Sequence, residues 1–281
     1  MIEGFIILFR ETLEASLVIG IVIATFKRQG IKDFHGTVYS AILLAILSSI
    51  AGAFLFDRLA GGFTGKGEQI FEGLVMIVSA VLLTTMIIWM LKNSNQGREL
   101  RRKLNERISS TYKLGVFFLV FTAILREGIE AVLFLSAANF ATGNNNLTGA
   151  LLGMAAAVAF SILFLAGTWR LNIRVFFTVI NITLILFASG LFSSGIHELQ
   201  EAGWIPVLRE DVFNINPPVL PDGSYPLLHE KGYIGSIAKG LFGYNGNPSL
   251  LELAGYAFYI VSASFAWLKI SRIEKKRLSG S

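Results

Sequence analysis

Long apolar runs separated by short polar segments dominate this chain. Seven of the runs are close to the 20 residues that an α-helix needs to cross the roughly 30 Å hydrocarbon layer of a membrane. The pattern predicts an all-α, polytopic membrane protein with seven transmembrane helices. The predicted helices lie at residues 4–26, 38–57, 69–91, 114–137, 149–169, 174–197 and 250–269.

Composition also indicates a membrane protein. Hydrophobic residues make up 53% of the 281 residues and charged residues only 15%, whereas soluble domains carry about 25% charged residues. The mean hydropathy is +0.62 and the isoelectric point is near 9.5. A basic chain can bind nucleic acid, but these basic side chains lie in short segments between apolar runs. We therefore expect membrane lipid as a partner and no nucleic acid.

The basic segments predict the orientation of the helices. Lysine and arginine gather after the first, third, fifth and seventh runs and are fewer on the other side. By the positive-inside rule the N-terminus lies outside and the C-terminus is cytoplasmic. We expect the first run to be a retained helix, because no basic segment precedes it and charged residues interrupt it, unlike a cleaved signal.

Two of the runs contain the same charged motif, RETLE in the first and REGIE in the fourth. Residues three or four apart share a face of a helix, so each motif gathers its arginine and two glutamates. A charge at the centre of a bilayer costs about 2.5–3.5 kcal/mol, which predicts that these side chains face the protein interior. The motif residues are Arg10, Glu11, Glu14, Arg126, Glu127 and Glu130.

The two motifs predict an internal repeat. Three spans separate them, so the two copies cross the membrane in opposite directions, as in the inverted repeats of many transporters, whose substrate sites lie near the membrane midplane. We expect a single transmembrane domain over residues 1–281. Its parts are a first three-helix repeat at 1–91, a second at 114–200, a long outer loop at 201–249, and a seventh helix with a cytoplasmic tail at 250–281.

The motif side chains have the chemistry of a cation site. Each arginine can neutralise one glutamate, which leaves one negative charge per motif and many carboxylate oxygens free. The chain has no cysteine, so a metal site must use oxygen or imidazole ligands, and carboxylates favour hard ions. Ferric, manganese and calcium ions all fit. The alternative is an ion-pair network that only fixes helix packing. The predicted metal ligands are Glu11, Glu14, Glu127 and Glu130.

A second group of acidic residues lies near the outer ends of the predicted helices. HELQEAGW is not a zincin motif, because Glu201 stands where the second histidine would be. Capping of helix ends and entry of a metal ion both explain this group, and its common outer placement favours entry. The following loop holds all six prolines and could form a lid or a docking surface. The outer candidates are Glu68, Glu72, His197, Glu198 and Glu201.

In combination, RETLE, REGIE, FEGLVMIVSAVLLTTMIIWM and HELQEAGW resemble the iron permease family of oxidase-dependent iron transporters. The resemblance implies a transporter and not an enzyme, with iron as its substrate and no other cofactor. It also implies import of ferric ion supplied by an extracytoplasmic ferroxidase or iron-binding protein. The lack of a targeting peptide and the simple seven-helix layout suggest a bacterial plasma membrane. The oligomeric state stays open, a homo-oligomer included. The commonest family motif has glycine where this chain has Thr12, which we do not expect to affect the ligands.

Three alternatives to ferric import remain. The first is a transporter of another cation, such as ferrous, manganese or lead ion. The second is a membrane enzyme that oxidises metal at a carboxylate-bridged metal pair, although such sites usually include a Glu-x-x-His that both motifs lack. The third is a metal sensor that binds through the outer loop without transport. The sequence alone separates none of these from iron import.

Overall fold

The computed structural model describes residues 1–28, 34–92, 113–165, 173–221 and 223–279, and within them the chain is helical and contains no strand. The helices are α1 (Ile2–Arg28), α2 (His35–Ala60), α3 (Lys66–Lys92), α5 (Lys113–Thr142), α6 (Leu147–Leu165), α7 (Ile173–Glu201), α8 (Tyr233–Phe242) and α9 (Leu250–Ser279).

The long helices coincide with the predicted apolar runs, which confirms the all-α architecture. Four of them are long and apolar enough to cross a membrane: α2, α3 over Lys66–Trp89, α7 over Thr178–Glu201 and α9 over Leu250–Ile270. Helices α1 and α5 are as long but carry the motif charges, and α6 is apolar over its described stretch Leu147–Leu163. Seven crossings and their orientation stay predictions.

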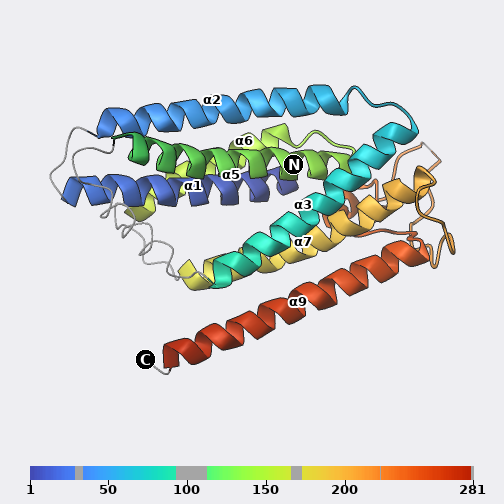
Figure 1. Cartoon of the computed structure of the whole chain (residues 1–281). Coiled ribbons are helices and arrows are strands. Elements are labelled where there is room, and N and C mark those ends of the chain that lie inside the picture. Colours follow the sequence, from blue (N-terminus) through green and yellow to red (C-terminus); the bar gives the residue numbers. More distant parts are fainter. Residues whose placement is uncertain (29–33, 93–112, 166–172, 222, 280–281) are drawn as a thin grey trace.

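The helices pack in pairs that join the first half of the chain to the second (Figure 1). α1 packs against α6, α2 against α5, α3 against α7, and α1 also against α5. α1 and α5 run in opposite directions, and α3, α7 and α9 form an inclined group beside the other four long helices. The two motif helices are therefore in direct contact.

Glycines allow the closest of these contacts. A Cβ atom at Gly149 would lie 1.7 Å from the carbonyl oxygen of Met1, and one at Gly153 would lie 2.2 Å from that of Phe5. Between α3 and α7, a Cβ at Gly73 would come within 2.9 Å of the carbonyl oxygen of Gly195, and a Cβ at Gly195 within 2.8 Å of the carbonyl oxygen of Gly73. Small residues at such crossings let two backbones approach, which is how helices commonly associate in membranes.

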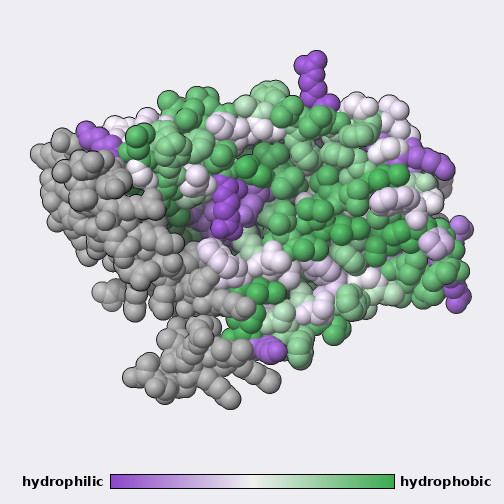
Figure 2. Space-filling view, in the orientation of Figure 1, coloured by the Kyte–Doolittle hydropathy of each residue, from purple (hydrophilic) through white to green (hydrophobic). Residues whose placement is uncertain are grey.

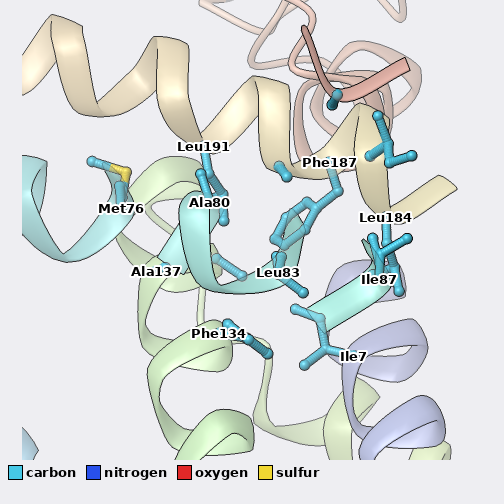
Figure 3. Packing of buried hydrophobic residues seen from close by; sticks show 14 of the residues in the cluster. Ile7, Met76, Ala80, Leu83, Ile87, Phe134, Ala137, Leu184, Phe187 and Leu191 are labelled. Carbon is cyan, nitrogen blue, oxygen red and sulfur yellow. The ribbon is translucent and has the colours of Figure 1, made fainter. Parts of the chain in front are cut away.

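Two apolar clusters flank the charged motifs. One joins α1, α3, α5, α7 and α9 and includes Ile7 and Phe134 (Figure 3). The other joins α1, α2 and α5 and includes Val22 and Ile124. The motif of each helix lies between its two cluster residues in sequence, so charged side chains occupy the middle of an otherwise apolar bundle.

The segment between α7 and α9 is structured. Its two ends bond to each other, through Val212 N–H to Pro248 O, 3.0 Å, and Ile215 N–H to Gly246 O, 2.8 Å. It contains α8, which none of the predicted runs includes. Gly240 of α8 lies against α1, since a Cβ there would come 1.9 Å from Oε1 of Glu3. A role of this segment as a lid or docking surface stays a prediction.

Candidate metal site

The first motif forms a closed ion-pair network in α1. Nη1 of Arg10 lies 2.9 Å from Oε1 of Glu11, and its Nη2 lies 3.0 Å from Oε1 of Glu14. The side chain of Arg10 is completely buried and that of Glu11 is 2% exposed. One arginine therefore pairs with both glutamates of its motif, where the sequence predicted one.

The second motif, in α5, has a different arrangement. Nε of Arg126 lies 2.7 Å from Oε1 of Glu130, and the side chain of Arg126 is 44% exposed. Its guanidinium carbon lies 5.1 Å from the centre of the Trp89 ring. Glu127 is buried, and no ion pair of Glu127 is found among the described residues. Two motifs of the same sequence pattern thus have different partners.

Three carboxylates from the two motifs converge. One oxygen each of Glu11, Glu127 and Glu130 lies within 4.8 Å of the other two. Metal–oxygen bonds of about 2.0–2.2 Å hold opposite ligands roughly 4.2 Å apart, so small movements would close this group around an ion. The predicted ligand Glu14 lies outside this group and pairs with Arg10.

The converging carboxylates have unused oxygens. Oε2 of Glu11, of Glu127 and of Glu130 are buried and accept no hydrogen bond from a nitrogen or hydroxyl donor in the described part of the chain. Buried carboxylates of like charge repel strongly in a low dielectric unless a cation or proton lies between them. With all groups ionised, two arginines against four glutamates leave two negative charges. The arrangement is suited to binding a cation through oxygen alone.

The outer residues form a different kind of cluster. Nδ1 of His197 lies 3.0 Å from Oε1 of Glu252, and its Nε2 lies 3.2 Å from Oε1 of Glu201. Glu201 also accepts a hydrogen bond of 2.9 Å from Gln69. These side chains connect α3, α7 and α9, and the contacts among them are those of a polar helix-end network.

The remaining outer candidates are less closely gathered. Glu68 is exposed, whereas Glu72 and Glu198 are partly buried. Glu72 lies within electrostatic range of Glu68 and Glu198. Within the described residues these carboxylates join no group of three close ligand atoms like that of the motifs.

Two residues that the candidate set left out contact it. Glu252, 3% exposed, accepts hydrogen bonds from His197 and from Nδ2 of Asn245, the latter of 2.6 Å. It is the one acidic residue in the apolar part of the last run, and that isolation was the available signal. Trp89 lies near the inner end of the third predicted helix, where tryptophans of a membrane interface are common. Nothing in the neighbouring sequence indicated a contact with Arg126.

Comparison with known proteins gives matches over nearly the full length. The chain is 30% identical over 275 residues, 95% of both chains, to a protein named ferrous iron permease EfeU from Escherichia coli O6:K15:H31 (strain 536 / UPEC). A protein of the same name from Yersinia pestis is 28% identical over 267 residues, 94% of this chain and 92% of the relative. An uncharacterized protein from Archaeoglobus fulgidus is 31% identical over 257 residues, 90% and 89% of the two chains.

No solved structure matches the chain. The family model described as the iron permease FTR1 family matches residues 1–274, a range that includes both charged motifs and the outer cluster. This match covers far more than half of the chain, and the relatives agree with it. The chain belongs to the iron permease FTR1 family.

Proposed function

We propose that this protein imports iron across the plasma membrane through a site formed by Glu11, Glu127 and Glu130. The observation that carries the proposal is the convergence of these three carboxylates, each with a buried oxygen that accepts no hydrogen bond from the described residues. Membership of a permease family makes iron the substrate to test first. A purely structural network would have its charges paired, and here Glu127 has no arginine partner among the described residues.

We also propose seven membrane crossings arranged as an inverted repeat, with the N-terminus outside. The packing pairs support the repeat. Exchanging α1 with α5, α2 with α6 and α3 with α7 converts the α1–α6 pair into α5–α2, and it leaves the α1–α5 and α3–α7 pairs unchanged. Such symmetry favours a path for the ion between α1 and α5, at the depth of the motifs.

In the proposed mechanism the arginines balance the site while no ion is bound. An arriving ion takes the carboxylate oxygens of Glu11, Glu127 and Glu130, and Glu130 exchanges its bond with Arg126 for the ion. Arginine stays protonated, so neither arginine competes by titration. A potential of 100 mV, inside negative, is worth about 2.3 kcal/mol for each charge moved, or roughly 7 kcal/mol for a trivalent ion.

The family resemblance predicts ferric ion as the cargo, and the charge of the site favours ferrous ion as a second candidate. The four glutamates and two arginines carry a net charge of −2 when all are ionised. A divalent ion neutralises that charge completely, whereas a trivalent ion leaves one positive charge in a buried site, which is costly. The relatives from Escherichia coli and Yersinia pestis are named ferrous iron permeases.

We extend the proposal to the outer end of the molecule. Glu68, Glu72, Glu198 and Glu201 would attract cations there, and an extracytoplasmic ferroxidase or iron-binding protein would deliver them. The negative side chains at the start of α3 and the end of α7 support such a role. Attraction of this kind acts on the association rate and weakens as salt rises.

The test is uptake of radioactive iron into liposomes under an inside-negative potential, with ferric and ferrous iron offered separately. Uptake by the wild type that Glu127→Gln lacks would support the proposal. Glu210→Gln is the matched control, because it removes an exposed outer carboxylate. Iron that binds without moving would favour a sensor, and iron that is oxidised without moving would favour an enzyme.

A further inference from the structure

The two motif arginines lie on opposite sides of the motif glutamates along the bundle. In each motif the arginine precedes its last glutamate by four residues, about 6 Å along the helix. Because α1 and α5 run in opposite directions (Figure 1), Arg10 lies toward the end where α1 begins, and Arg126 lies toward the end where α5 begins. An ion moving along the bundle therefore passes one arginine before the glutamates and the other after them.

The two ends are not in the same state. Arg10 is completely buried and holds both Glu11 and Glu14, so its end is closed. Arg126 is 44% exposed and holds only Glu130, so it is the more accessible and the less tightly paired of the two arginines. Figure 2 shows a group of hydrophilic atoms among hydrophobic ones near the middle of this face of the molecule.

Trp89 contacts Arg126. Its ring, near the end of α3, lies 5.1 Å from the guanidinium carbon of Arg126. A guanidinium over an indole face is attracted by the electrons of the ring, and tryptophan gives the strongest such contact. If Arg126 were free to copy Arg10, it would bond both Glu127 and Glu130. On the ring it forms an ion pair with Glu130 and none with Glu127, which stays available to the converging group.

We propose that Trp89 is a positioning residue that holds Arg126 away from Glu127 and thereby keeps the carboxylate site open at the end where α5 begins. The proposal rests on the proposed function for its meaning, because the site must bind an ion for the opening to matter. The opposite state would have Arg126 buried between Glu127 and Glu130. In that state Arg10 would be the exposed arginine, because exchanging the two repeats exchanges the environments of Arg10 and Arg126.

Arginine modification tests this geometry without any iron. Purified protein is treated with phenylglyoxal, and the modification of each arginine is followed by peptide mass spectrometry. In the wild type we expect Arg126 to react and Arg10 to stay protected. In Trp89→Leu we expect Arg126 to react about three- to fivefold more slowly, the range that loss of one cation–π contact predicts, because it folds onto Glu127. Trp89→Phe, which keeps a ring, should largely restore the wild-type rate.

Two further variants separate positioning from a general structural effect. In the Glu127→Gln background Arg126 keeps Glu130 but loses the second carboxylate onto which it would fold, so adding Trp89→Leu should no longer slow its modification. Trp204→Leu removes an exposed tryptophan from the outer segment and should change nothing. A rate for Arg126 that is unchanged or higher in Trp89→Leu would overturn the proposal, as would equal slowing in the Glu127→Gln background. Arginine rates as expected in a protein that takes up no iron would refute the proposed function and leave the positioning role standing.

Discussion

Gly128 lies so close to Ser49 that a Cβ atom at position 128 would come 1.9 Å from the Ser49 Oγ and 2.6 Å from its Cβ. Gly128 directly follows Arg126 and Glu127 in the sequence, so α2 and α5 are in contact at the second motif itself. The first motif has Thr12 at the equivalent position. Close packing therefore restricts one copy of the motif and tolerates a larger side chain in the other.

We expect Gly128→Ala to separate α5 from α2 and to displace Glu127 and Glu130. Overpacking of this kind costs about 1–3 kcal/mol, and iron uptake should fall along with the thermal unfolding temperature in detergent. Thr12→Ala is the matched control and should leave both nearly unchanged. Adding Ser49→Gly should recover much of the loss in Gly128→Ala; a double variant as impaired as the single one would contradict this explanation.

Lysine in place of the two arginines should have unequal effects. Arg10 uses both terminal nitrogens to hold two carboxylates, and lysine offers a single charged nitrogen without the planar fork. Arg126→Lys loses less, since Arg126 bonds only Glu130 and is partly exposed. We expect uptake to fall in both and further in Arg10→Lys, with a greater loss of thermal stability. Equal losses of uptake in the two variants would show that the different pairing of Arg10 and Arg126 does not affect transport.

The four motif glutamates should contribute unequally to iron binding. Glu127 lies in the converging group and Glu14 does not. Removing one partner of a buried charged site costs roughly 3–5 kcal/mol, so Glu127→Gln should weaken iron binding more than 100-fold. Glu14→Gln should weaken it much less, and equilibrium binding of iron to purified protein measures both. Similar affinities in the two variants would place the ion elsewhere.

The contact between His197 and Glu252 should hold the outer segment on the helices. Glu252 bonds both His197 of α7 and Asn245, which lies between α8 and α9. We expect Glu252→Leu to release this attachment, so that limited proteolysis cuts the segment 202–249 faster. Glu210→Leu changes an exposed glutamate within the segment and should not alter the cleavage rate. If the cleavage rate of Glu252→Leu equals that of the wild type, contacts other than those of Glu252 hold the segment on the helices.

Hydropathy predicted the helices well because membrane burial requires long apolar runs, and these survive any change in packing partner. The charged motifs were also evident, since Arg10 and Glu14 share a helix face at any packing angle. Helix α8 was missed because it is short, and its glycines at 235 and 240 disfavour a helix in isolation. Its packing against α1 through Gly240 depends on the whole fold.

The asymmetry of the site was beyond the reach of the sequence. RETLE and REGIE supply the same charged groups, so pattern alone predicts equal pairing of Arg10 and Arg126. The difference comes from Trp89, which follows the start of α3 by more than six turns and reaches Arg126 only through the packing of α3 on α5. Contacts of this kind depend on the relative placement of helices, which local spacing does not determine.

X-ray absorption at the iron edge tests most directly whether Glu11, Glu127 and Glu130 bind iron. The sample is purified protein loaded with one equivalent of iron. We expect one tightly bound iron per chain with a first shell of oxygen alone, at about 2.0–2.2 Å. The same preparation of Glu127→Gln should hold no iron at this site. Retention of iron by Glu127→Gln, or a first shell containing imidazole nitrogen, would contradict a site built from Glu11, Glu127 and Glu130.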